Sequence, residues 1–129
     1  MSDNQEGVVV LVVEDEWTVL EILRLELEDA GWQVLTAKTG ESALATMRET
    51  PIDLLVTDIR LAGKTTGWEV AVLARRTRPA MPVIYATGSP SDDVLRVSES
   101  AFFAKPYNPA DIVTKGRQLL ASNRPAPLH

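Results

Sequence analysis

The sequence contains no cysteine and only one histidine, and each shortage excludes a kind of chemistry. Without cysteine the chain cannot form disulfides, thiolate metal sites or cysteine nucleophiles, and this composition suits a reducing compartment such as the cytosol. The one histidine, His129, is the last residue, so we expect it to lie in a frayed chain end. A catalytic or metal site built on histidine is therefore not expected.

Long hydrophobic runs are also missing. The longest apolar run, residues 8–13 (VVVLVV), is far shorter than the roughly 20 residues that span a bilayer. Residues 1–7 are polar and acidic, and they lack the basic start and the apolar stretch of a secretory signal. We therefore expect no membrane partner and a cytoplasmic protein.

Basic residues are too scattered for a nucleic-acid surface. The chain has 13 Lys and Arg against 18 Asp and Glu, which gives a formal charge of -5. No basic stripe is available to neutralise a phosphate backbone, so we expect no direct nucleic-acid binding.

What the sequence does contain is typical of one folded domain. Of its 129 residues, 45% are hydrophobic and 24% are charged, an ordinary globular composition. A chain of this length needs only one core. We expect a domain over residues 8–121, a flexible N-terminus over residues 1–7 and a flexible tail over residues 122–129.

Short apolar runs alternate with segments of helical periodicity along the whole chain. The alternation predicts an α/β fold: a doubly wound, five-stranded parallel sheet with helices on both faces. The helix expected around residues 92–98 has the weakest pattern, because it holds few apolar residues. The predicted strands cover residues 8–13, 32–37, 52–57, 82–86 and 101–104. The other four helices are predicted between residue 16 and Gly31 and over residues 39–49, 68–76 and 109–121.

Polar residues stand at the ends of four of these strands, where ligands bind in such sheets. Glu14 and Asp15 follow the first strand, Asp58 the third, Thr87 the fourth and Lys105 the fifth. Three carboxylates brought together repel one another unless a cation offsets them, and oxygen ligands suit Mg²⁺. One Asp is then free to act as a nucleophile, with the Lys and Thr side chains aimed at phosphoryl oxygens. The set predicts aspartyl phosphate chemistry.

Each of these residues taken alone has a simpler explanation. The acids after the first strand suit a helix start, Asp58 suits a turn or helix cap, and Thr87 with Gly88 suits a turn. A lone Lys105 is most simply a solvated side chain. The occurrence of all of them at strand ends favours one shared site.

The motifs resemble, in order, those of the receiver domain of response regulators, the CheY-like family, over almost the whole chain. They are Glu14-Asp15 after VVVLVV, Asp58 after LLVT, Thr87 after VIYA and Lys105-Pro106 after FFA. The resemblance implies a flavodoxin-like sheet with strand order 2-1-3-4-5. It also implies a two-component signalling module, a binding protein rather than an enzyme, that is phosphorylated on Asp58.

The resemblance further implies a ligand set for Mg²⁺. Asp15 and Asp58 would bind the ion directly, Glu14 through water, and Arg60 through its backbone carbonyl. The Lys105–Pro106 peptide bond would be cis.

A switch and a set of partners are implied in the same way. Thr87 would move toward the phosphoryl group and Phe102 would rotate, although a static core aromatic explains Phe102 equally well. The phosphoryl donor would be a histidine kinase or a histidine phosphotransfer protein, and an unidentified downstream protein would respond. A homodimer through residues 92–98, 101–104 and 109–121 is one assembly that the resemblance allows.

Two departures from the family pattern concern the loop after Asp58. Ala62 stands where a proline is common, and the stretch up to Gly67 is one residue longer than usual. We therefore expect this loop to be held loosely. Because the chain ends soon after its last predicted helix, we expect a single-domain regulator, with an excised piece of a longer protein as the alternative.

Three other functions are alternatives for this set of residues. A phosphorelay intermediate or phosphate sink uses the same residues without a switch. A Mg²⁺-dependent phosphohydrolase commonly carries a second acid two residues after its nucleophile, where this chain has Arg60. A receiver-like domain that no longer accepts phosphate is disfavoured because every pocket residue is present.

Overall fold

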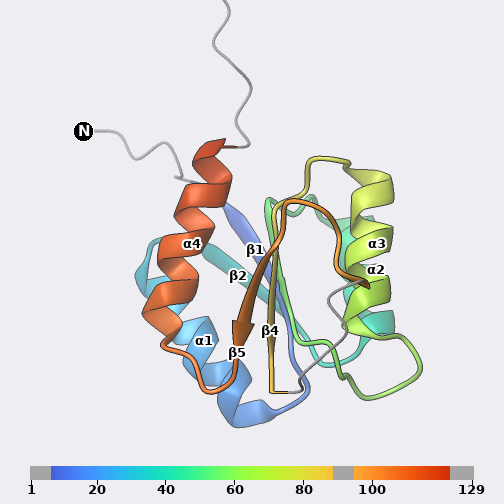
Figure 1. Ribbon diagram of the computed structural model, residues 1–129, viewed down its shortest axis with the longest axis horizontal. Coiled ribbons are helices and arrows are strands. Elements are labelled where there is room, and N and C mark those ends of the chain that lie inside the picture. The colour runs from blue at the N-terminus through green and yellow to red at the C-terminus, as the bar shows by residue number, and fades with distance from the viewer. Residues whose placement is uncertain (1–6, 89–94, 123–129) are drawn as a thin grey trace, which may run out of the picture.

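The computed structural model describes residues 7–88 and 95–122 and contains a five-stranded, all-parallel sheet (Figure 1). The strand order is β2-β1-β3-β4-β5, as the resemblance implied. Expectations for residues 1–6 and 123–129, His129 included, lie outside the described residues. The strands are β1 (Val9–Val13), β2 (Gln33–Ala37), β3 (Leu54–Thr57), β4 (Val83–Thr87) and β5 (Ala101–Ala104).

Helices cover both faces of the sheet, which confirms the doubly wound fold. They are α1 (Trp17–Asp29), α2 (Gly40–Glu49), α3 (Gly67–Thr77) and α4 (Pro109–Ser122). Helices α1 and α4 lie side by side on one face, and α2 and α3 lie on the other (Figure 1). None of the helices that the structure describes is both long and apolar enough to traverse a lipid bilayer.

Two hydrophobic cores lie on opposite faces of the sheet because successive side chains of a strand point in opposite directions. Val10 and Val12 of β1 belong to the core under α1 and α4, and Leu11 and Val13 belong to the core under α2 and α3. All four are at most 1% exposed. A continuous apolar run is therefore needed in this strand, which is why the sequence shows no alternation there.

Local signals begin and end the helices. Gly31 ends α1 with a φ of 95°, the left-handed conformation expected of a glycine at this position. At the start of α3, Thr66 and Glu69 form a capping box, in which each side chain accepts from the other residue's backbone N–H.

The expected helix around residues 92–98 is wrong for its described part. Residues 92–94 lie outside the described residues, and residues 95–98 are not α-helical, since a 3₁₀ conformation at Leu95 gives way to a bend and a turn. The backbone groups here are bonded elsewhere: Val97 donates its N–H to the Tyr85 hydroxyl (3.0 Å), and the Ser100 hydroxyl donates to the Val97 carbonyl (2.7 Å). Glu99 adopts a left-handed φ of 54°. These bonds to side chains replace a helical ladder.

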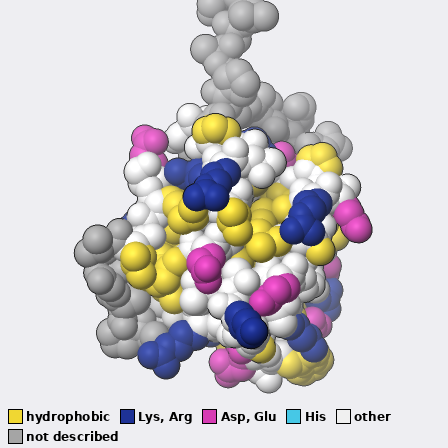
Figure 2. All heavy atoms as spheres, turned by 90° about the vertical axis from the view of Figure 1, so that its right-hand side faces the viewer, with side chains coloured by type: hydrophobic (Ala, Val, Ile, Leu, Met, Phe, Trp, Pro, Cys, Tyr) yellow, Lys and Arg dark blue, Asp and Glu magenta, His cyan; other side chains and the backbone are white. Residues whose placement is uncertain are grey.

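The outer surface over α2 and α3 carries charges of both signs. Figure 2 shows this face, with apolar side chains gathered near its middle and Lys, Arg, Asp and Glu scattered among them. Among the apolar residues, Val72 is 38% exposed and Leu95 is 53% exposed.

Candidate functional site

The register of the central strands brings the predicted site residues together. Strands β1 and β3 are hydrogen-bonded neighbours with Val13 opposite Thr57, and the Asp58 N–H donates to the Val13 carbonyl (2.9 Å). The residues that follow these strands, Glu14, Asp15 and Asp58, therefore leave the sheet at the same edge.

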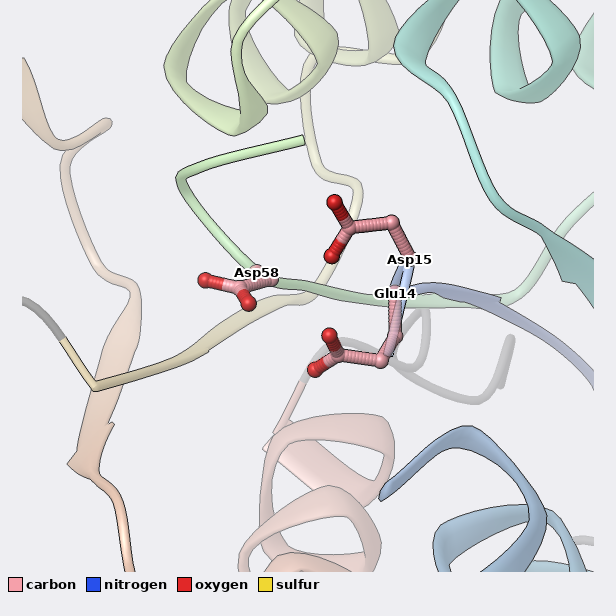
Figure 3. Close-up of side chains that lie close together, drawn as sticks. All are labelled: Glu14, Asp15 and Asp58. Atoms are coloured by element: carbon pink, nitrogen blue, oxygen red, sulfur yellow. The ribbon is translucent and has the colours of Figure 1, made fainter. Parts of the chain in front are cut away.

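These three carboxylates form a compact cluster. Each residue offers a carboxylate oxygen that lies within 4.8 Å of those of the other two. Figure 3 shows the side chains of Glu14 and Asp15 reaching from the end of β1 toward the carboxylate of Asp58. Glu14 is 3% exposed and Asp58 is 7% exposed, whereas Asp15 lies at the surface. The cluster is therefore partly buried, and Asp15 is its solvent-exposed member.

Lys105 lies inside the cluster. Its Nζ is 2.9 Å from Oδ2 of Asp58 and 2.7 Å from Oε1 of Glu14, and it lies 3.8 Å from Oε1 of the exposed Glu16. The backbone fixes this position, because the Lys105 N–H donates to the Thr87 carbonyl (2.8 Å) at the edge of the sheet. The Lys105–Pro106 bond is cis, as the resemblance implied.

The electrostatics of the pocket follow from burial and from these ion pairs. Burial raises the pKa of Glu14 to about 7, against the lowering effect of its hydrogen bond with Lys105. Burial alone would lower the pKa of Lys105, but the hydrogen bonds to Glu14 and Asp58 raise it above its ordinary value. The Lys105 ammonium therefore stays charged, and its single positive charge is shared between the carboxylates of Glu14 and Asp58.

This donor set fits Mg²⁺. The cluster holds three carboxylates, and Lys105 pairs with two of them, Glu14 and Asp58, so a divalent ion would offset the remaining negative charge. All of the donors are hard oxygen atoms, and one or two carboxylates are what a Mg²⁺ site usually takes from a protein. Glu14, Asp15 and Asp58 are the residues that would hold the ion.

The backbone around Asp58 holds its carboxylate in place. Oδ1 of Asp58 accepts from the N–H of Ile59 (2.6 Å), and the Thr57 hydroxyl donates to the Asp58 carbonyl (2.7 Å). Gly67 packs directly on this carbonyl: a Cβ at residue 67 would lie 1.9 Å from the Asp58 oxygen. A side chain at position 67 would therefore displace the residue that the pocket is built around.

The remaining predicted residues lie on strands β4 and β5 and on the loop after Asp58. Thr87 is 1% exposed at the end of β4, opposite Ala104 of β5. Phe102 is half-buried, with its ring centroid 6.4 Å from that of Tyr85. Arg60 is exposed on the loop after Asp58.

Sequence reasoning did not assign roles to two residues that border the pocket. Glu16 is exposed and pairs with Lys105, whereas the sequence indicates only that the acids after the first strand suit a helix start. Tyr107 is half-buried, and burial raises its pKa to about 12, with the Glu14 carboxylate adding to the effect. Its position two residues after Lys105 was the only available signal.

Comparisons with known proteins agree with this geometry. The sequence model described as the response regulator receiver domain matches residues 10–117. This chain belongs to the response regulator receiver domain family. Receiver domains are signalling modules of two-component systems; they interact with histidine kinases and downstream effectors, and they bind Mg²⁺ at an acidic site.

Two curated relatives illustrate the sequence similarity. The chain is 31% identical over 115 residues to the alkaline phosphatase synthesis transcriptional regulatory protein PhoP of Bacillus subtilis, covering 86% of this chain and 48% of PhoP. It is 32% identical over 123 residues to the probable transcriptional regulatory protein TcrX of Mycobacterium tuberculosis, covering 92% and 52%. The chain thus spans about half the length of these relatives.

Solved structures show the same fold. A response regulator receiver protein from Sinorhizobium medicae has a TM-score of 0.88 at 32% identity, over 94% of this chain and 100% of that one. The response regulator TrrA of Thermotoga maritima, solved in complex with Mg²⁺-BeF, has a TM-score of 0.76 at 29% identity, over 87% and 98%.

Proposed function

We propose that this receiver domain accepts a phosphoryl group on Asp58 in a Mg²⁺-dependent reaction and thereby changes a protein-binding surface. The observation that carries the proposal is the contact of Asp58 with Lys105 (2.9 Å) inside a cluster of three carboxylates. The similar regulator TrrA, solved with Mg²⁺-BeF, supports a metal-dependent site for this chain.

Asp58 is the nucleophile in this mechanism. One of its carboxylate oxygens attacks the phosphorus of a phosphohistidine in the donor protein, a new O–P bond forms, and the P–N bond breaks. The histidine nitrogen leaves with the electron pair of that bond. The backbone N–H of Ile59, 2.6 Å from Oδ1, holds the carboxylate in one orientation during this exchange.

The other groups of the pocket offset charge on the phosphoryl oxygens. Mg²⁺ bound by Glu14, Asp15 and Asp58, with the Arg60 carbonyl as a further ligand, would supply positive charge there. Lys105 is already paired with Asp58, so its ammonium can follow the transferred group by exchanging one anionic partner for another. Thr87, at the end of the neighbouring strand β4, would donate its hydroxyl to a phosphoryl oxygen.

The output follows from Thr87 and Phe102. Movement of Thr87 toward the phosphoryl group would favour a new rotamer of Phe102, whose half-buried ring lies on the edge strand β5. The phosphoryl donor is a histidine kinase or a histidine phosphotransfer protein, and the responding partner is a protein that binds near β5. A homodimer through this edge is one form that the response can take.

The proposal is tested by intact-protein mass spectrometry after incubation with Mg²⁺ and acetyl phosphate. We expect a phosphate-sized mass increase (about 80 Da) for the wild type, and none for Asp58→Asn or in excess EDTA. Asp111→Asn is the matched control, because it makes the same change in the first turn of α4, away from the carboxylate cluster. An adduct that persists in Asp58→Asn would contradict the assignment of the acceptor.

A wild type without an adduct is then given a purified histidine kinase that phosphorylates other receivers. Transfer to Asp58 under those conditions would retain the proposal. Absence of transfer with both donors, while a positive-control receiver is phosphorylated, would overturn it.

A further inference from the structure

The loop between β3 and α3, residues 59–66, is held by the first turn of α2. Thr39, the N-cap residue of α2, forms an isolated parallel β-bridge with Ala62 of the loop. At its far end the loop is tied to the pocket, since the Gly67 N–H donates to the Ile59 carbonyl (2.8 Å). Helix α2 thus contacts the loop at Ala62, the position where a proline is common in the family.

Glu41 makes the polar contact between α2 and the loop. Its Oε2 accepts from the Lys64 backbone N–H at 3.2 Å. Backbone hydrogen bonds, that of its own N–H first and that of Lys64 next, lower the pKa of Glu41, and Thr65 adds side-chain and backbone hydrogen bonds. Its carboxylate thus stays ionised and serves as an acceptor for consecutive loop residues.

The loop residues facing α2 have no spare room. A Cβ at Gly63, whose φ of 92° already favours glycine, would lie 2.9 Å from Oε1 of Glu41. A Cβ at Gly40 would lie 2.6 Å from the Thr65 side chain and 2.8 Å from the Thr65 carbonyl. Two glycines thus allow helix and loop backbones to approach closely, and Glu41 lies at their junction.

The contact between α2 and the loop lies close in sequence to the expected metal ligand. Three residues separate Arg60, whose carbonyl is the expected metal ligand, from Lys64, whose N–H binds Glu41. Since the loop is fixed at Asp58 by its packing on Gly67 and at residues 62–65 by α2, the path of Arg60 between these anchors is determined by both.

We propose that Glu41 is a positioning residue for the phosphorylation site: by holding residues 63–65 against α2, it sets where the loop presents its backbone to Mg²⁺. This inference rests on the proposed function. Glu41 itself touches neither the acceptor nor the metal ligands, and it acts through the loop.

The test is a Mg²⁺ titration of the ¹⁵N-labelled protein, followed by the amide shifts of residues 58–60. Glu41→Ala should weaken Mg²⁺ binding on the order of tenfold, as removal of supporting contacts around metal ligands does. Glu41→Gln keeps an acceptor oxygen at the same place and should bind Mg²⁺ within about twofold of the wild type. Glu49→Ala is the matched control, because it removes the same charge from the last residue of α2.

Two further readouts separate positioning from a general loss of stability. The phosphorylation rate of Glu41→Ala with acetyl phosphate should return to the wild-type value at saturating Mg²⁺. Hydrogen exchange of the Lys64 amide should be faster in Glu41→Ala and unchanged in Glu49→Ala. The thermal unfolding midpoint of Glu41→Ala should fall by only a few degrees, because the variant loses one surface hydrogen bond and the acid in the first turn of α2.

Each other outcome overturns the inference. Equal Mg²⁺ affinities for Glu41→Ala and Glu49→Ala would remove the coupling between α2 and the pocket while leaving the proposed function intact. If Glu41→Gln also bound Mg²⁺ weakly, the effect would come from the negative charge of Glu41 and not from its hydrogen bonds to the loop. A Glu41→Ala variant that is partly unfolded at the temperature of the titration would make the role structural. A wild type whose amides do not respond to Mg²⁺ would overturn this inference together with the metal-dependent function.

Discussion

The centre of the sheet and its β5 edge differ in how they are built. Every residue of β3 and β4 is buried, and four of the five residues of β1 are. In β5, by contrast, three residues are half-buried and Ala104 is exposed. Residues 95–100, which precede β5, are bonded through side chains rather than through a regular backbone ladder.

The difference in burial between the centre and the β5 edge matches the two parts of the proposed function, phosphorylation and output. Glu14 and Asp58 extend directly from the buried strands β1 and β3, so their carboxylates are held by the most rigid part of the molecule. Phe102 lies in β5, where fewer buried contacts make local rearrangement less costly. Lys105 connects the two regions, because it follows β5 and pairs with both carboxylates. In the proposed function, phosphorylation at the centre of the sheet changes the protein-binding surface at its β5 edge.

The largest expected loss of stability comes from a substitution at Gly67, which packs against Asp58 at the centre of the sheet. Gly67→Ala should lower the free energy of unfolding by more than about 3 kcal/mol, because the new Cβ meets the Asp58 backbone, which cannot move aside. Urea denaturation measures the change. Gly88→Ala is the control, since a Cβ there would make only ordinary contacts with Lys105, at 3.6 Å and beyond. Similar losses in both variants would contradict this account of the pocket.

A matched pair of leucines compares the two regions directly. Leu55→Ala in β3 should lower the free energy of unfolding by about 3 kcal/mol, because the side chain is fully buried and leaves a cavity. Leu95→Ala should cost less than about 0.5 kcal/mol, since Leu95 is 53% exposed. Chemical denaturation of both variants measures the contrast. A large loss for Leu95→Ala would show that the edge is packed more firmly than its burial indicates.

The same contrast explains which elements were predictable. Strands β1 and β4 were expected at residues 8–13 and 82–86 and lie at Val9–Val13 and Val83–Thr87, because a strand buried on both faces must be apolar throughout. Strand β3 begins at Leu54 rather than at residue 52. The Asp53 carboxylate accepts the Val9 N–H (2.8 Å) just before the ladder starts, a long-range contact that no local pattern encodes.

The site was predictable for a similar reason, and its supporting contacts were not. Glu14, Asp15 and Asp58 meet because the carboxyl ends of parallel strands share one edge. The turns at residues 95–98 depend on the hydroxyl of Tyr85, 12 residues earlier in the chain than Val97. The contact of Glu41 with the loop depends on the backbone N–H of Lys64, 23 residues later in the chain. Such side-chain to backbone bonds between distant segments have no periodicity to detect.

Addition of Mg²⁺ should stabilise the centre and leave the edge unchanged. At ten times its dissociation constant, the ion should add about 1.4 kcal/mol to the free energy of unfolding, because only the folded pocket gathers the carboxylates. Thermal denaturation measures the gain, and Asp15→Asn, which removes a carboxylate of the cluster, should reduce it. Slower hydrogen exchange is expected near Asp58 and not at residues 95–100. Equal protection in both regions would mean that metal binding alone already reorganises the edge.

The smallest expected effect concerns the hydrogen bond between the Tyr85 hydroxyl on β4 and the Val97 N–H, which precedes β5. Tyr85 is fully buried between the rings of Trp68 (4.8 Å between centroids) and Phe102, and its hydroxyl accepts the Val97 N–H. Tyr85→Phe keeps the ring and removes this acceptor, so the free energy of unfolding should fall by about 1 kcal/mol and exchange of the Val97 amide should accelerate. Denaturation and hydrogen exchange measure the two changes.

Tyr107→Phe is the matched control for this variant. It removes the same oxygen from a half-buried tyrosine for which the described residues provide no hydrogen bond. We expect a change below about 0.5 kcal/mol and unchanged exchange at Val97. If Tyr85→Phe left the Val97 amide as protected as this control does, residues 95–100 would be held by the contacts of Arg96 with Ser100 and Phe102, and the edge would be anchored independently of the centre.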